Sequence, residues 1–237
     1  MLSRIVVTLV VGFAALALAA CGGSGPSSAS RSASATTGAA SHPSSSTAAS
    51  DSAGTASSAA TGSQISYEGV SIEAGPELAP AASAQTATVD GIRCGATEQL
   101  AYHIHAHLAV FDNGTIRALP AGIGIPGSTT QQTGQGPVAA GGQCIYWLHT
   151  HTADGIIHVE SPTQRIYTLG NFFDEWHQPL SADQVGTVRG HVTAYVNGTL
   201  WHKSLRAIPI TPHALIQLNA GAPAPPLASV TWSQTGL

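Results

Sequence analysis

The chain has 237 residues, of which 8 are Lys or Arg and 12 are Asp or Glu, so its formal net charge at pH 7 is −4 with neutral histidine. This acidic balance argues against nucleic-acid binding, which depends on clustered Lys and Arg. Histidine is in excess instead, because the chain has 11 histidines and a single methionine, Met1. The lack of thioether ligands argues against a methionine-rich copper(I) carrier.

The N-terminus has the pattern of an export signal, predicted over residues 1–20. Arg4 supplies the positive charge, and the apolar run that follows is shorter than the roughly 20 residues of a membrane span. The sequence Leu18-Ala19-Ala20-Cys21 resembles the lipobox of bacterial lipoproteins. The resemblance implies cleavage before Cys21, lipidation of its thiol, and a protein anchored to a membrane of the cell envelope outside the cytoplasm. An ordinary signal peptide followed by a stray cysteine is the alternative.

Cys21 begins a segment made almost entirely of Ser, Ala, Thr and Gly, with an occasional Pro, that extends to residue 63. Its composition cannot bury enough apolar surface to fold, so we expect a disordered tether. As a flexible coil it would reach about 35 Å. Residues 64–237 have the length of one ordinary domain, and we predict a single globular, His-rich β domain there.

Cys94 and Cys144 are the two cysteines of this predicted domain. In an exported protein an even pair favours a disulfide. A metal site built on their thiolates is the alternative.

Two Asn-Gly pairs, at residues 113–114 and 197–198, predict β-hairpins over residues 102–119 and 191–202. The ten residues that begin at His107 and the ten that begin at His191 share His, Asn, Gly and Thr at equal positions. This similarity suggests a weak internal duplication.

A third hairpin is predicted over residues 144–160, with Asp154-Gly155 as its turn. A two-residue turn places His151 opposite His158 and His149 opposite Glu160, all on one face of the hairpin. A four-residue loop would shift the pairing by two positions and keep these side chains on the same face. Either register brings three imidazoles and a carboxylate together.

Beyond the third hairpin, residues 168–176 predict a short helix capped by Thr168, and residues 181–184 begin another turn or helix. Residues 214–218 and 227–232 predict two further extended segments. The fold class is therefore a β-rich α+β domain of hairpins, with six to nine strands and one or two short helices.

Histidines also alternate along the first predicted strand, at His103, His105 and His107. Alternate residues of a strand project from one face, so these imidazoles and those of the third hairpin supply enough ligands for one metal site, with two sites as the alternative. The predicted metal ligands are His103, His105, His107, His149, His151, His158 and Glu160. Nitrogen and oxygen donors favour Zn or Cu(II), with Ni or Fe as further candidates.

Three functions remain open: a lipid-anchored protein for metal acquisition, delivery or buffering, a metal-dependent enzyme with the same cluster, and an adhesion or assembly module without metal. The sequences Tyr-His-x-His-Ala-His-Leu and Leu-His-Thr-His, followed by Gly-Ile-Ile-His-x-Glu, resemble uncharacterised bacterial exported proteins. This resemblance implies no activity. The segment from His149 to Asp154 is similar to the His-x-His-x-Asp-His motif of metallo-β-lactamases, but it has one residue too many and lacks the last His.

Overall fold

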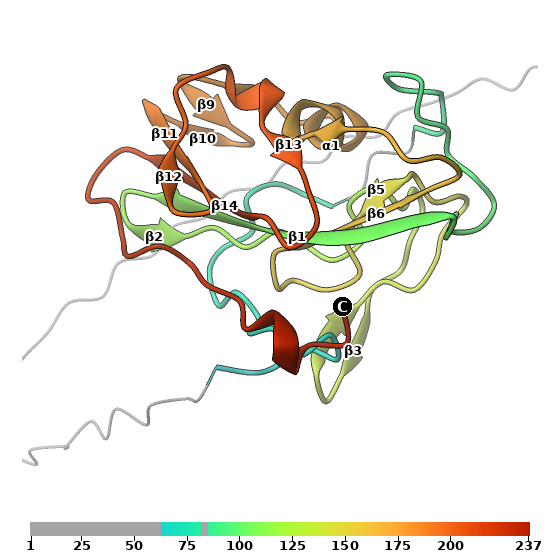
Figure 1. Ribbon diagram of the computed structural model, residues 1–237. Coiled ribbons are helices and arrows are strands. Elements are labelled where there is room, and N and C mark those ends of the chain that lie inside the picture. Colours follow the sequence, from blue (N-terminus) through green and yellow to red (C-terminus); the bar gives the residue numbers. More distant parts are fainter. Residues whose placement is uncertain (1–62, 82–84) are drawn as a thin grey trace, which may run out of the picture. The chain divides into compact units, whose positions relative to one another are not determined.

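The structure is a computed structural model that describes residues 63–81 and 85–237 (Figure 1). These residues belong to one compact unit, Ser57–Leu237. The predicted export signal, Cys21 and all but the last residue of the predicted tether lie outside the described residues. Within the described ranges, none of the helices has the length and apolar character that a membrane span requires.

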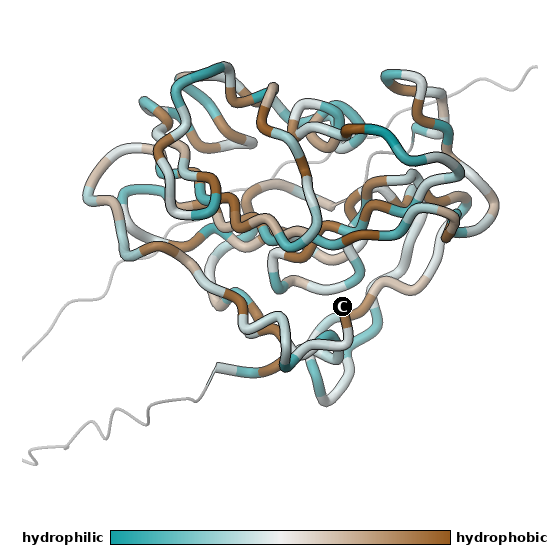
Figure 2. Tube along the Cα trace, viewed as in Figure 1, coloured by the Kyte–Doolittle hydropathy of each residue, from teal (hydrophilic) through white to brown (hydrophobic). Residues whose placement is uncertain are grey.

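A seven-stranded sheet forms the centre of this unit. Its strand order is β12 (Thr199–Leu200), β11 (Val192–Val196), β14 (Leu215–Ala220), β1 (Tyr102–Asp112), β6 (Ile156–Ser161) and β5 (Leu148–His149), and β2 (Thr115–Ile116) also pairs with β1. The β1 and β14 strands run parallel, whereas β1 and β6 are antiparallel. Hydrophobic stretches are frequent along the central strands (Figure 2).

Three smaller sheets and two 3-10 helices complete the described part. The small sheets pair β8 (Leu180–Ser181), β9 (Gln184–Val185) and β10 (Val188–Arg189), β7 (Tyr167–Thr168) with β13 (Pro209–Ile210), and β3 (Gln131–Thr133) with β4 (Gly136–Val138); the 3-10 helices are η1 (Leu205–Ala207) and η2 (Trp232–Gln234). The strand-rich class is confirmed. The predicted number of strands was too low, because many of the observed strands have only two residues. Residues 181–184 belong to a hairpin and residues 227–231 to no regular element.

Helix α1 (Leu169–Trp176) begins where the sequence predicts it. Thr168 is the N-cap, and its side chain and that of Asn171 form a reciprocal capping box. Phe172, Phe173 and Trp176 are buried in the hydrophobic core. The helix therefore follows from a local capping signal and one apolar face.

Both Asn-Gly turns are confirmed, because Asn113, Gly114, Asn197 and Gly198 all have positive φ angles, as a type I′ turn requires. The two hairpins lie in the same sheet, but β1 pairs parallel with β14 and β11 pairs antiparallel with it. The structure does not show the predicted duplication.

Strand β1 separates the core from the histidine-bearing face. Ala106, Leu108 and Val110 join the hydrophobic core. Because side chains alternate along a strand, His103, His105 and His107 project from the opposite face. One face of β1 therefore packs in the hydrophobic core, and the other face carries the histidines.

The predicted disulfide between Cys94 and Cys144 is present, with a Cα–Cα distance of 5.4 Å. Next to it, the backbones of Gly95 and Ile145 exchange two hydrogen bonds of 2.9 and 2.8 Å. The crosslink thus anchors the segment that leads into β5.

Candidate metal centre

The histidine cluster is assembled by the pairing of β6 with its two neighbours, β1 and β5. His158 lies opposite His149 on one side and opposite His105 on the other. His103 lies opposite Glu160. Directly opposed side chains share a face of the sheet, so the pairing gathers these groups in one place.

The predicted two-residue turn at Asp154-Gly155 is wrong by two register positions. Pairing between β5 and β6 ends at His149, and residues 150–155 form the connection. Thr150 directs its amide to Ile123 O at 3.0 Å and its hydroxyl to Pro120 O at 2.8 Å, so it does not continue the ladder. A shift of two conserves strand parity, and the cluster forms as expected.

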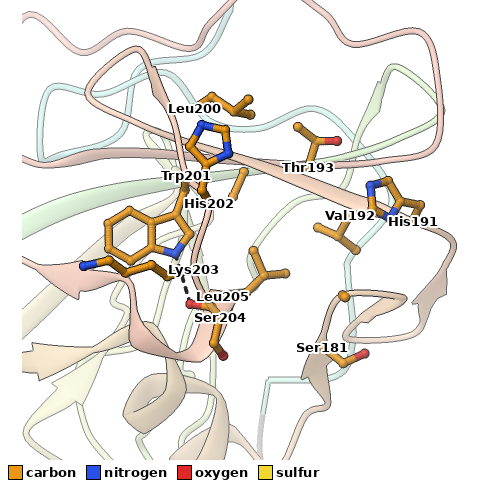
Figure 3. A pocket seen from close by; sticks show the side chains of 12 residues that line it. Ser181, His191, Val192, Thr193, Leu200, Trp201, His202, Lys203, Ser204 and Leu205 are labelled. Carbon is orange, nitrogen blue, oxygen red and sulfur yellow. Dashed lines mark hydrogen bonds between the residues drawn. The ribbon is translucent and has the colours of Figure 1, made fainter.

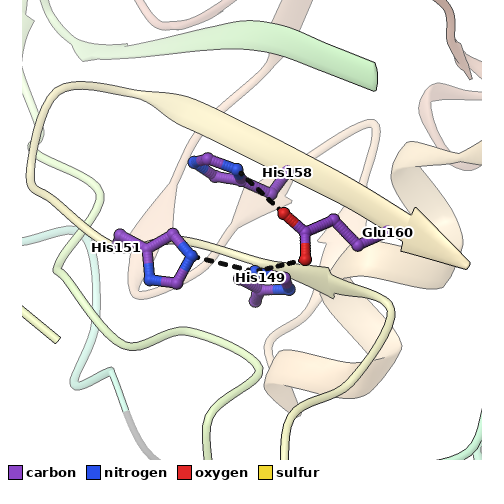
Figure 4. A group of neighbouring side chains, drawn as sticks. All are labelled: His149, His151, His158 and Glu160. Atoms are coloured by element: carbon purple, nitrogen blue, oxygen red, sulfur yellow. Dashed lines mark hydrogen bonds and ion pairs between the residues drawn. The ribbon is translucent and has the colours of Figure 1, made fainter. Parts of the chain in front are cut away.

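His149 and His151 point their Nε2 atoms at each other, 3.1 Å apart (Figure 4). Each ring uses its other nitrogen to bind a backbone carbonyl, His149 Nδ1 to Tyr146 O at 2.9 Å and His151 Nδ1 to Ala139 O at 2.8 Å. A carbonyl only accepts, so both Nδ1 atoms donate, and an Nε2 atom carries a lone pair wherever its ring is neutral. A proton or a metal ion between the two Nε2 atoms would remove the repulsion of facing lone pairs.

His158 and Glu160 complete the group on the same side (Figure 4). His158 Nδ1 is 3.6 Å from Glu160 Oε1, and Glu160 Oε2 is 3.9 Å from His149 Nε2. His158 Nε2 is held by Glu68 Oε1 at 3.0 Å. Both His158 Nδ1 and Glu160 Oε2 are buried and lack a hydrogen-bond partner among the residues described.

Burial and neighbouring charges set the protonation of the cluster. Burial and then the charges of His158 and His151 lower the pKa of His149 well below 6.5. Burial would also lower the pKa of His158, but the close carboxylates of Glu160 and Glu68, the second of them hydrogen-bonded to His158 Nε2, outweigh that effect and raise the pKa to about 9. A proton is therefore disfavoured on His149 and favoured on His158.

The donor set fits a metal ion. One potential ligand atom from each of His149, His151, His158 and Glu160 lies within 4.8 Å of the others. Tetrahedral zinc with Zn–N bonds of about 2.0–2.1 Å separates its nitrogen ligands by roughly 3.3 Å, close to the observed approach of the two Nε2 atoms. The carbonyl and carboxylate partners of the outer nitrogens are those that orient metal-binding histidines.

A second group of possible ligands adjoins the first. His103, His105 and His158 also place one donor atom each within 4.8 Å of one another. His103 Nε2 is 3.1 Å from Glu160 Oε1. A pocket of about 580 Å³ opens beside both groups, and its lining includes His103, His105, His151, His158 and Glu160.

His107 is the one predicted ligand that the structure places in neither group. It lies opposite Ile156, past the histidine pairs, and the backbone of Asp154 is its hydrogen-bonding neighbour. Burial lowers its pKa to about 4. His107 is thus a buried neutral residue beside the connection into β6, and strand parity alone overestimated the extent of the cluster.

The other histidines of the described part lie apart from this cluster. His177 adopts the left-handed conformation at the end of α1, and His213 stacks on Trp232 with ring centroids 4.6 Å apart. His191 and His202 line a separate pocket of about 540 Å³ (Figure 3). They belong to neither of the two ligand groups found among the described residues.

Glu68 and Glu98 are site residues that the sequence reasoning missed. Glu68 is buried against His158, and Glu98 Oε1 is 3.5 Å from His151 Nε2. Ser66 reaches the same region and donates to Asp154 Oδ2 at 2.6 Å. These residues come from loops with no strand periodicity, so no local pattern marks them.

The fold and the cluster define a strand-rich protein with a buried His/Glu group that could bind a metal ion. No protein-family model matches the chain, and neither a curated protein nor a solved structure is significantly similar to it.

Proposed function

We propose that this chain is a lipid-anchored, extracytoplasmic protein that binds a transition metal ion for acquisition, delivery or buffering. The export and anchoring part of the proposal is supported by the N-terminal sequence, with Cys21 as the acylated residue. The metal-binding part is supported by the buried cluster of His149, His151, His158 and Glu160.

One observation supports metal binding most strongly. The Nε2 atoms of His149 and His151 face each other at 3.1 Å while both Nδ1 atoms donate to backbone carbonyls. Burial works against a proton on His149, because it lowers the pKa of that ring. A metal ion satisfies both lone pairs without adding a proton.

Zn or Cu(II) is the metal that this donor set favours, with Ni or Fe as further candidates. The cluster offers imidazole nitrogens and carboxylate oxygens, which suit these ions of intermediate softness. Both cysteines of the described part are joined in the disulfide, so neither offers a thiolate. The cluster therefore lacks the cysteine thiolate that a blue-copper site requires.

Elemental analysis of the full chain, purified without a histidine tag, tests the proposal. We expect at least one transition metal ion per chain, and a loss of that ion when His149 and His151 are both changed to Ala. His202→Ala is the matched control, since His202 is exposed and lies outside both ligand groups. Protein that binds no ion after incubation with Zn or Cu(II) would refute the metal function and favour an adhesion or assembly module.

Lipid anchoring is tested separately. Mass spectrometry of the protein produced in its bacterial host should show a mature N-terminus at Cys21 with a diacylglyceryl group and a further acyl chain. Cys21→Ser is expected to remove the modification and release the protein from membranes. An unmodified cysteine in the mature protein would contradict this part of the proposal.

The pocket beside the cluster favours a second candidate, a metal-dependent enzyme. His103, His105 and Glu160 line both the pocket and the ligand groups, so a bound ion there would be reachable by a small substrate. In that case a bound ion would supply Lewis acidity, and Glu160 would help to hold the ion. Turnover of an ester, amide or phosphate substrate that disappears in the variant with His149 and His151 changed to Ala would support the enzyme.

A further inference from the structure

We infer that this centre holds two metal ions, joined by the carboxylate of Glu160, with the second ion at His103 and His105. The inference rests on the proposed metal binding and deepens it. The first ion lies with His149, His151 and His158, and the second lies on the side of the pocket.

Glu160 has the position of a bridging ligand. Its Oε1 is 3.1 Å from His103 Nε2, whereas its Oε2 is 3.9 Å from His149 Nε2. One oxygen of this buried carboxylate thus faces His149, and the other lies between His103 and His158, 3.6 Å from His158 Nδ1. Oε2 has no hydrogen-bond partner in the described part of the chain. Carboxylates that lie between two ligand groups are suited to two-metal sites, where the ions are about 3.5–4 Å apart.

His105 gives an independent reason for a second ion. Its ring packs edge-on against His103 and His158, with centroids 4.5 and 4.6 Å apart. Its Nε2 atom is buried and has no partner among the described residues. A buried imidazole nitrogen without a partner costs free energy, and ligation of an ion would recover that cost.

The number of donors exceeds what one ion uses. A tetrahedral zinc ion takes four ligands, which His149, His151, His158 and Glu160 supply. His158 Nε2 is hydrogen-bonded to Glu68, so His158 Nδ1 is the nitrogen that binds the first ion. His103 and His105 are left over, and with the other oxygen of Glu160 they form a second, incomplete set.

The two positions differ in access to solvent. The side chain of His149 is 0% exposed, whereas that of His103 is 39% exposed. His103 and His105 line the pocket, and His149 does not. His151, His158 and Glu160 also line the pocket, so the first ion is the more deeply buried one at His149 and the second lies nearer to solvent, with coordination positions open to water or to an oxygen-donor ligand.

Metal titration of the full chain without a histidine tag, first stripped with a chelator, tests this inference. Equilibrium dialysis against Zn²⁺ is expected to give two ions per chain, one tightly bound and one weaker. With His103 and His105 both changed to Ala, the count should fall to one, and the tight site should keep its affinity within about threefold. Changing both His191 and His202 to Ala removes the same number of imidazoles elsewhere and should leave two ions.

The outcomes separate this inference from the proposed function. A wild-type chain that binds one ion overturns the second site and leaves metal binding standing, and a chain that binds none overturns both. Two ions that persist without His103 and His105 also overturn the inference. If the double variant does not fold by circular dichroism, His103→Gln takes its place, since that side chain is partly exposed. It should weaken the second ion at least about tenfold and leave the first unchanged.

Discussion

The proton on His158 makes metal binding depend on pH in a range where ordinary histidines no longer titrate. The close carboxylates of Glu160 and Glu68 outweigh burial and raise the pKa of His158 to about 9. At pH 7.5 the metal-free protein therefore carries about one proton there, whereas His149, with its lowered pKa, carries none. An ion that takes His158 Nδ1 must displace that proton.

The sign and size of the effect follow from this competition. Below pH 9 a proton holds the nitrogen that the ion needs, so the apparent Kd of the first ion falls about tenfold for each unit of rising pH. The dependence should extend from pH 6.5 to about 8.5 and flatten above pH 9. A histidine with an ordinary pKa near 6.5 would release only about a tenth of a proton at pH 7.5.

Isothermal titration calorimetry in buffers of different ionisation enthalpy counts the protons released. At pH 7.5 we expect about one proton per first ion bound. Glu68→Gln keeps a hydrogen-bond acceptor but removes a charge, so the pKa of His158 and the proton release should both fall. Asp183→Asn, which removes an exposed charge in the β8–β9 hairpin, is the control. Release of about 0.3 proton or less by the wild type, or no change in Glu68→Gln, would refute the reasoning.

Three further predictions concern the framework of the site. Burial raises the pKa of Glu175 well above 4.5, so the folded state loses stability as the pH rises above that value. In urea unfolding, Glu175→Gln should therefore stabilise the protein by at most about 3 kcal/mol at pH 7 and hardly at pH 4. An equal gain at both pH values would contradict this. Changing Cys94 and Cys144 to Ser opens a loop with a sequence separation of 50 and should cost about 4 kcal/mol in urea unfolding, and a cost below about 1 kcal/mol would contradict the loop-closure estimate. A Cβ on Gly124 would lie 2.2 Å from the carbonyl oxygen of Leu148 and 3.1 Å from His149 Cβ, so Gly124→Ala should displace β5 and its histidine. We expect metal binding to weaken at least about tenfold in chelator competition. Gly134→Ala, with open space around the added Cβ, should leave the affinity unchanged.

Local signals in the sequence predicted the elements whose structure is decided locally. The Asn-Gly pairs at residues 113–114 and 197–198 form the expected turns, and Thr168 caps the expected helix. The position of β14 could not be predicted in this way. It inserts between β1 and β11, and neither pairing has a short-range signal because the partners are far apart in the chain.

The register of β5 and β6 shows where local reasoning fails for a physical reason. Asp154-Gly155 is a good turn sequence, yet the hydrogen bonds of Thr150 go to Pro120 and Ile123. Ala139 likewise donates its amide to His151 O at 2.8 Å. These tertiary bonds replace the ladder bonds that a tight hairpin would have made. The cluster nevertheless formed because a shift of two positions does not change which face a side chain occupies.

Glu68 marks the limit of what strand parity can predict. The alternation of side chains along paired strands predicts which histidines share a face. It wrongly added His107, whose pairing partner is Ile156, to the predicted ligands. It carries no information on a loop residue that arrives from 90 positions away to bind His158. Because Glu68 raises the pKa of His158 and accepts a hydrogen bond from its ring, the affinity and proton linkage of the proposed metal site would depend on a residue outside the pattern. The clustering of His149, His158 and Glu160 can thus be predicted from the strands, whereas the contact that raises the pKa of His158 comes from a loop.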